Sequence, residues 1–155
     1  MKHRFAVPID DLREGAEEVC LLPEASAQDW AAIFRQADPL RLDAGQTLVK
    51  AGQQDTALYL LTEGDISAIA GSSGVPFKTI EAPSVLGEIA FLDGAPRTVT
   101  LVAATDCIVA RIDRAAYEDL AIEEPELARQ LALDLGRIAA VRLRLVSERI
   151  VTLGG

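Results

Sequence analysis

A carboxylate and a guanidinium nine residues apart carry the chemistry that this sequence offers most clearly. Glu88 follows Gly87, and Arg97 precedes the hydroxyl side chain of Thr98. Arginine presents a planar, permanently charged fork that binds phosphate through two hydrogen bonds, and an acidic side chain can accept a hydrogen bond from a sugar hydroxyl. Together these residues can hold a phosphate and the sugar beside it. The sequence therefore predicts a nucleotide sensor rather than an enzyme.

The same residues also allow an interpretation without a ligand. Glu88 and Arg97 could form an ion pair across a hairpin, with Gly87 and Gly94 serving only as turn residues. Ion pairs of this kind are common on protein surfaces and contribute little to stability. The residue types alone leave both interpretations open.

A short helical turn is expected between the two charged residues, at residues 88–92. Gly87 lets the backbone approach a ligand closely, and the first N–H groups of the turn, at Ile89 and Ala90, have no acceptor within a helix. The positive end of the helix dipole favours an anion at this place. The turn can therefore supply backbone donors to a phosphate.

Strands must position this turn. Residues 39–112 contain short runs of Leu, Val, Ile and Thr separated by glycines, and residues 58–70 are typical of two strands around a Glu-Gly-Asp turn. Many short strands with glycine turns predict a small β-barrel or jelly roll.

Helices are expected on both sides of the strands. Ser26 can cap a helix that runs to residue 36, with Asp29 three residues after the cap, and Asp113 can cap a helix that runs to residue 121. Pro125 opens a long helix that continues to about Ile150. Residues 11–23 are expected to form a short helical arm.

The long helix carries two apolar stripes. One stripe can pack on the strands, and the other needs a partner or belongs to a lid that the ligand closes; alternatively, both stripes form one broad buried face. The first consists of Leu127, Leu131, Leu135, Ile138 and Leu145, and the second of Leu133, Ala140, Leu143, Val146 and Ile150.

Composition excludes several classes of function. The net charge of the 155 residues is -9, which argues against nucleic acid as the main partner. We find no apolar run that could cross a bilayer and no signal peptide, so a cytoplasmic location is expected. Cys20 and Cys107 are too few for a disulfide framework, and His3 is the one histidine, so neither a metal site nor a histidine-based catalytic site is expected. Cys107 is expected to be a buried thiol.

The residues around Glu88 and Arg97 resemble the phosphate-binding cassette of the cyclic nucleotide-binding domain. This family includes catabolite activator proteins, cyclic-nucleotide-dependent kinase regulators and gated channels. The cassette of the family reads F-G-E-[LI]-A-L followed by P-R-[ST]-A-[TS]. The matching segments here are Leu86-Gly87-Glu88-Ile89-Ala90-Phe91 and Pro96-Arg97-Thr98-Val99-Thr100. The resemblance continues through residues 44–52 and 58–64 and covers residues 26–148.

This resemblance implies a mainly β fold, a cyclic nucleotide-binding β-roll (jelly roll) with an N-terminal helix and two C-terminal helices. It divides the chain into an N-terminal arm at residues 1–25 and the binding domain at residues 26–155. By the same resemblance Glu88 would bind the ribose 2′-hydroxyl, and Arg97 and Thr98 the cyclic phosphate. The ligand-binding residues that it implies are Gly87, Glu88, Ile89, Ala90, Arg97, Thr98, Val99 and Arg142.

Two of these assignments carry alternatives. Thr98 is compatible with both cAMP and cGMP, since the hydroxyl can reach a phosphate or a purine. Arg142 falls where relatives place a residue that caps the base by stacking, but it could equally extend along the helix surface.

Two positions depart from the cassette of the family. Val99 replaces a small alanine and narrows the pocket, and Leu86 replaces a phenylalanine in the packing.

The resemblance implies a cAMP or cGMP receptor without a catalytic site, a cofactor, or a DNA-binding or catalytic domain of its own. It would signal through movement of the C-terminal helix to a downstream protein, and the second stripe suggests a homodimer through that helix. The alternative is a ligand-free protein-interaction module with the same fold. No membrane insertion is expected.

Overall fold

The computed structural model describes Phe5 and residues 19–71 and 73–154 of the chain. Its four helices are α1 (Ala27–Gln36), α2 (Glu88–Asp93), α3 (Arg114–Glu123) and α4 (Pro125–Gly154). Its eight strands are β1 (Asp38–Leu42), β2 (Thr47–Val49), β3 (Leu58–Glu63), β4 (Asp65–Ala70), β5 (Pro76–Glu81), β6 (Ser84–Leu86), β7 (Val99–Ala103) and β8 (Cys107–Ile112).

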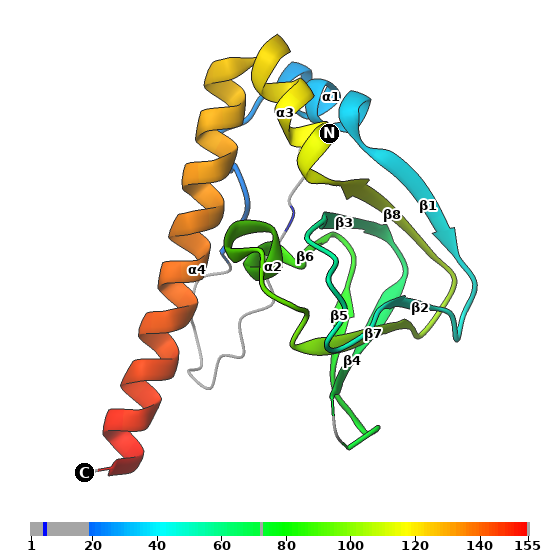
Figure 1. Cartoon of the computed structure of the whole chain (residues 1–155), viewed down its shortest axis with the longest axis vertical. Helices are drawn as coiled ribbons and strands as arrows, with labels where there is room; N and C mark the ends of the chain where they lie inside the picture. The colour runs from blue at the N-terminus through cyan, green and yellow to red at the C-terminus, as the bar shows by residue number, and fades with distance from the viewer. Residues whose placement is uncertain (1–4, 6–18, 72, 155) are drawn as a thin grey trace.

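The strands form two four-stranded antiparallel sheets, in the orders β1-β8-β3-β6 and β2-β7-β4-β5. Figure 1 shows α1 and α3 at one end of this β-roll, and α4 along its side with α2 between them. The predicted β-roll with an N-terminal helix and two C-terminal helices is confirmed. Within the described residues, no helix combines the length and hydropathy that a membrane span requires.

The predicted pair of strands in residues 58–70 is present as β3 and β4, but the two strands belong to different sheets. Gly64 between them has a φ of +89°, and a Cβ at this position would overlap the carbonyl oxygen of Asp106. The backbone therefore turns a tight corner from one sheet into the other, which a larger residue would not permit. Cys107 next to this corner is buried, as predicted.

Both predicted helix caps are confirmed. The Ser26 side chain accepts from the N–H of Asp29 at 3.1 Å, and the Asp29 carboxylate accepts from the N–H of Ser26 at 2.9 Å. Asp113 caps α3 by accepting from the N–H of Ala116 at 2.7 Å. These caps satisfy N–H groups that a helix cannot satisfy itself, and so fix where α1 and α3 begin.

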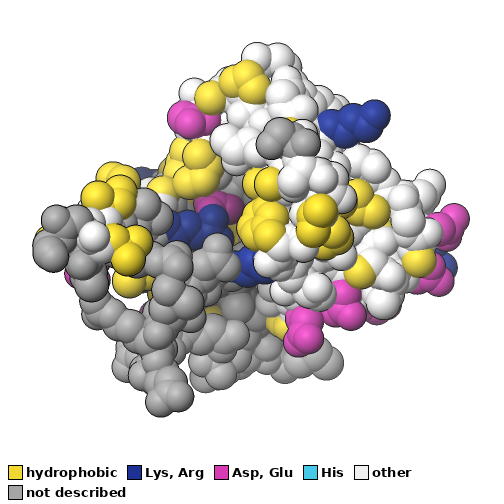
Figure 2. All heavy atoms as spheres, turned by 90° about the horizontal axis from the view of Figure 1, so that it is seen from below, with side chains coloured by type: hydrophobic (Ala, Val, Ile, Leu, Met, Phe, Trp, Pro, Cys, Tyr) yellow, Lys and Arg dark blue, Asp and Glu magenta, His cyan; other side chains and the backbone are white. Residues whose placement is uncertain are grey.

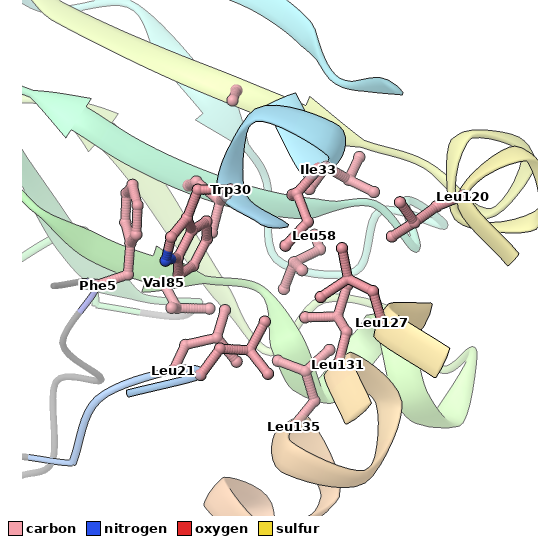
Figure 3. Close-up of a cluster of buried hydrophobic side chains, with 14 of the residues drawn as sticks. Phe5, Leu21, Trp30, Ile33, Leu58, Val85, Leu120, Leu127, Leu131 and Leu135 are labelled. Atoms are coloured by element: carbon pink, nitrogen blue, oxygen red, sulfur yellow. The ribbon is translucent and has the colours of Figure 1, made fainter. Parts of the chain in front are cut away.

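The main core lies where the helices meet the sheet that contains β3. Leu127, Leu131 and Leu135 of α4 point toward Leu58 of β3 and Ile33 of α1 (Figure 3). All five side chains are almost fully buried. This packing fixes the N-terminal half of α4 against the roll.

The second stripe of α4 is exposed, so the predicted single broad buried face is wrong. Leu133 and Leu143 are each 67% exposed and Ile150 is 65% exposed, whereas Ile138 of the first stripe is fully buried. Leu145 is half-buried, and the side chain of Val146 lies outside the described set.

The predicted helical arm is not observed where the chain is described. Residues 11–18 lie outside the described residues, and residues 19–24 form a bridge and turns instead of a helix. Leu21 and Leu22 are buried in the core, and the N–H of Leu22 donates to Asp134 of α4 at 2.7 Å. The apolar residues that suggested a helix therefore serve to attach this segment to α4.

Candidate functional site

A cavity of about 160 Å³ lies between α2, the loop that leads into β7, and α4. Every residue that the sequence analysis assigned to ligand binding contributes to its lining. These residues are Gly87, Glu88, Ile89, Ala90, Arg97, Thr98, Val99 and Arg142. The fold thus brings three separate segments to one place, and the part that each residue takes in binding stays a prediction.

The backbone at Arg97 is held on both sides by the turn before β3. Its N–H donates to the carbonyl oxygen of Gln53 at 2.9 Å, and its carbonyl oxygen accepts from the N–H of Gly52 at 2.7 Å. These bonds fix the direction in which the side chain leaves the backbone.

The guanidinium of Arg97 is buried, with 6% of the residue exposed. Nη1 donates to the carbonyl oxygen of Gly87 at 3.0 Å, and Nη2 donates to the carbonyl oxygen of Ala57. The guanidinium carbon Cζ of Arg97 lies 5.6 Å from the centre of the Tyr59 ring. Among the described residues, Nε of Arg97 has no hydrogen-bond partner. A buried donor of this kind favours an anionic ligand nearby.

Gly87 is required for this arrangement. Its φ is +78°, and a Cβ at this position would overlap Nη1 of Arg97 and lie 3.2 Å from the carbonyl oxygen of Ala57. Glycine therefore permits both the left-handed backbone at the start of α2 and the close approach of the guanidinium.

Asp55 is a site residue that the sequence analysis missed. Its Oδ2 lies 3.4 Å from Nη2 of Arg97 and accepts from the Tyr59 hydroxyl at 2.6 Å, and its Oδ1 accepts from the N–H of Ala57 at 3.0 Å. Burial opposes the charge of Asp55, but these hydrogen bonds and the charges of Arg97 and Arg111 lower its pKa below the ordinary 3.8. Burial and the bond to Asp55 raise the pKa of Tyr59. Asp55 is thus the counter-ion of the buried guanidinium.

Charged side chains continue from Asp55 toward α3. Arg111 lies 3.7 Å from Asp55 and 3.1 Å from Asp113, the residue that caps α3. The next residue, Arg114, donates to the carbonyl oxygen of Phe91 in α2. The start of α3 is therefore linked to α2 and, through Arg111, to the counter-ion of Arg97.

Glu88 pairs with Arg142 and not with Arg97. Glu88 is 2% exposed, and its Oε1 accepts from Nη1 of Arg142 on α4. The hairpin ion pair between Glu88 and Arg97 is therefore wrong, because each residue has a different partner. Arg142 also does not extend along the helix surface. It reaches into the cavity from α4, and its contact with a base stays a prediction.

The remaining predicted residues differ in exposure. Ala90 is buried, Ile89 is 43% exposed, and Thr98 is exposed at the rim. Val99 is half-buried and also lines a second cavity.

The second cavity, of about 170 Å³, adjoins the first one and shares Gly87, Glu88, Val99, Leu101 and Arg142 with it. Its other lining residues are Ala68, Phe77, Lys78, Ile80, Val85 and Leu86. Figure 2 shows basic and acidic side chains near the centre of the face seen from below, with hydrophobic side chains on both sides. The first cavity therefore contains the buried guanidinium of Arg97, and the second cavity is mainly apolar.

Comparison with known proteins identifies relatives of this chain. The family model of the cyclic nucleotide-binding domain matches residues 39–124, more than half of the chain. A cAMP-dependent protein kinase regulatory subunit from Aspergillus niger is 34% identical over 104 residues, which are 67% of this chain and 25% of the relative. A CRP-like cAMP-activated global transcriptional regulator from Mycobacterium tuberculosis is 29% identical over 126 residues, 79% of this chain and 54% of the relative. The chain thus spans about a quarter of the kinase regulatory subunit.

Solved structures show the same fold. The catabolite activator protein of Thermus thermophilus has a TM-score of 0.75 at 20% identity, with 86% of this chain and 62% of that chain covered. A cyclic nucleotide-binding domain from Methylobacillus flagellatus has a TM-score of 0.71 at 21% identity, with 85% and 76% covered.

Proposed function

Because this chain belongs to the cyclic nucleotide-binding domain family, we propose that it is a receptor for a purine 3′,5′-cyclic monophosphate, cAMP or cGMP, and acts as a regulatory domain and not as an enzyme. The two relatives from Aspergillus niger and Mycobacterium tuberculosis are regulators by their names, and both names include cAMP. We expect it to act in the cytoplasm.

The buried guanidinium of Arg97 is the observation that carries this proposal. It is held by two backbone carbonyls and by Asp55, and its Nε has no partner among the described residues. A cyclic phosphate carries one negative charge and would sit against Nε and the N–H groups at the start of α2. Burial excludes water from the pair and strengthens it.

Glu88 supports the assignment of the sugar. Its carboxylate lies next to the same cavity, and Arg142 occupies Oε1. A ribose hydroxyl could donate to the other oxygen, so the sugar, Glu88 and α4 would be connected. Ligand binding would then shift the position of α4, provided that the ligand contacts differ between two positions of this helix.

The exposed stripe of α4 supports a helical partner for the signal. Leu133, Ala140, Leu143 and Ile150 are exposed and follow spacings of seven, three and seven residues. This spacing is typical of a helix that packs against another helix. We propose that α4 passes the signal to a second copy of this chain or to a downstream protein.

Isothermal titration calorimetry with cAMP and cGMP tests the receptor function, using the full chain and its Arg97→Gln variant. Removing a buried partner of a phosphate should weaken binding by about 2–5 kcal/mol. Arg41→Gln is the matched control, because it removes an exposed arginine of β1.

The expected result is saturable binding that Arg97→Gln weakens by this amount and Arg41→Gln preserves. Absence of binding by the unchanged protein would contradict the proposal and favour a ligand-free interaction module. Unfolding curves of the three proteins without ligand show whether Arg97→Gln is folded.

A further inference from the structure

A third cavity, of about 470 Å³, lies between residues 22–25, the start of α1 and the first half of α4. It shares no lining residue with the two cavities of the candidate site and is larger than either of them. Its volume falls within the range of about 300–1,000 Å³ that is typical of binding pockets. The cavity therefore has room for a binding partner other than the nucleotide.

Hydrogen bonds hold the walls of this cavity together. The carboxylate of Asp134 accepts from the N–H of Leu22 and from Nε of Arg137, each at 2.7 Å. Nη2 of Arg137 also donates to the carbonyl oxygen of Cys20 at 3.3 Å. Figure 1 shows this N-terminal segment, in blue, beside α4. The cavity is thus built into the fold, so little conformational freedom is lost when a partner binds.

The lining combines negative charge with apolar surface. Its carboxylates belong to Glu24, Asp29 and Asp134, and Arg137 is its cation among the described residues. Arg137 is already bonded to Asp134, and Asp29 uses Oδ2 for the cap of α1. Negative charge therefore remains at Glu24 and at Oδ1 of Asp29. The apolar part of the lining consists of Leu22, Pro23, Ala25 and Leu133, of which Pro23 and Leu133 are exposed.

We propose that this cavity binds an arginine of a partner protein, in a segment with apolar residues on both sides of the arginine. The guanidinium would lie at Glu24 and Asp29, and the methylene stem and the apolar neighbours would cover Pro23 and Leu133. This inference rests on the proposed role of α4 in passing the signal to another protein, and it specifies the chemistry of that protein. The binding itself requires no nucleotide.

Charge complementarity selects this partner. The carboxylates would repel an acidic or phosphorylated segment. Arginine suits the cavity better than lysine, because its planar fork donates to two carboxylates at once and because arginines often anchor protein interfaces. A free small cation would leave Pro23 and Leu133 in water, whereas a protein segment with apolar neighbours buries them.

The cavity adjoins the exposed stripe of α4 without coinciding with it. Leu133 is the residue that the lining and the stripe have in common. A segment bound in the cavity therefore leaves the rest of the stripe open to a second helix.

NMR titration of the isotopically labelled full chain tests this inference. The probe is the tripeptide acetyl-Leu-Arg-Leu-amide, and acetyl-Leu-Gln-Leu-amide is its matched control. We expect the amide signals of residues 22–25 and 130–137 to shift, while those of residues 87–90 and 97–99 stay in place. The arginine tripeptide should bind about tenfold more tightly than the glutamine tripeptide, because it gains hydrogen bonds between charged groups.

Three variants assign the difference to the cavity. Glu24→Gln should remove most of the tenfold preference for the arginine tripeptide. Glu118→Gln, which removes an exposed carboxylate of α3, should preserve it. Leu133→Ala should weaken the binding of both tripeptides about threefold through lost apolar contact. Glu24 and Leu133 are exposed, so these variants are expected to fold.

Other outcomes contradict the proposed partner. Equal binding of the two tripeptides, or a preference that survives in Glu24→Gln, overturns the role of the carboxylates. Shifts spread over the whole surface indicate unspecific attraction to a chain of net charge -9 and overturn the site. If arginine amide binds as tightly as the arginine tripeptide, the cavity takes a small cation instead of a protein segment. If the same signals change when the protein alone is diluted, a second copy occupies the cavity.

Addition of cAMP and cGMP to the same samples separates this inference from the proposed function. Binding of a nucleotide without binding of the tripeptide overturns the docking site while the receptor function stands. Binding of the tripeptide without binding of either nucleotide contradicts the receptor function while the docking site stands.

Discussion

Two arginines reach the candidate site from opposite sides, and the fold holds them in different ways. Arg97 comes from the β-roll, with its backbone fixed to Gly52 and Gln53 and its side chain fixed to two carbonyls and Asp55. Arg142 comes from α4, where 27% of its side chain is exposed, and it contacts Glu88 across the cavity. One wall of the site is therefore built into the sheets, and the other is carried by a helix.

This difference agrees with the proposal that the roll recognises the ligand and that α4 moves. Leu127, Leu131 and Leu135 fix the first half of α4 in the core, whereas Leu143 and Ile150 in the second half are exposed. Less buried area means a lower free energy for local displacement. We therefore expect a displacement of the region around Arg142 to need less free energy than a displacement of Arg97. The following predictions test this contrast.

Gly87→Ala should have the largest effect, because it acts on the fixed wall. The new Cβ would overlap the Arg97 guanidinium, so the arginine must leave its carbonyl partners. We expect a loss of about 2 kcal/mol or more in cyclic nucleotide binding, measured by calorimetry.

Gly74→Ala is the matched control for backbone strain. Gly74 has a φ of +68°, close to the +78° of Gly87, but no atom lies within 4 Å of its Cβ position. Backbone strain should cost both variants about 1 kcal/mol in free energy of unfolding, and Gly87→Ala should lose more because Arg97 leaves its buried partners. If Gly74→Ala weakens nucleotide binding as much as Gly87→Ala does, displacement of Arg97 is not the cause.

Asp55→Asn should have the next largest effect, because it removes the counter-ion of Arg97. We expect a loss of about 1–3 kcal/mol in free energy of unfolding at neutral pH. Since the folded-state pKa of Asp55 lies below 3.8, its carboxylate stabilises the fold above that pH and loses this contribution as the pH falls. The difference between the variant and the unchanged protein should therefore shrink in strong acid.

Urea unfolding at neutral pH and at pH about 3 measures this dependence. Asp119→Asn is the control, because Asp119 is exposed on α3. A constant difference between Asp55→Asn and the unchanged protein at both pH values would contradict the role of the charge.

Arg142→Gln should have a smaller effect on stability and a local effect on motion. The contact with Glu88 is partly exposed to water, so we expect a loss of about 1 kcal/mol in free energy of unfolding. Amide hydrogen exchange should become faster in residues 139–154 of α4 and stay unchanged in β7. Arg144→Gln, an exposed arginine on the same helix, should change neither. Equal acceleration in β7 would show that α4 and the roll open together.

The two arginines also show how far the sequence predicts the structure. Arg97 and Gly87 lie within one short motif, and the short α2 helix between them was predicted from local residue types. Asp55 was missed because it meets Arg97 across 42 residues, and no local pattern marks that contact. Its position four residues before Tyr59, at the entry to a buried strand, is a signal that could have drawn attention to it. Arg142 was found by position, but its bond to Glu88 depends on the angle at which α4 packs.

Leu143→Gln should have the smallest effect on the folded chain. Leu143 is 67% exposed, so the free energy of unfolding of the single chain should change by less than about 0.5 kcal/mol. Its effect on association should be larger, because Leu143 lies in the middle of the exposed stripe. We expect the unchanged protein to sediment as a dimer and the variant to shift toward the mass of one chain. If both sediment as single chains with and without nucleotide, the stripe does not join two copies. The proposed signal through the second half of α4 would then need a different partner protein.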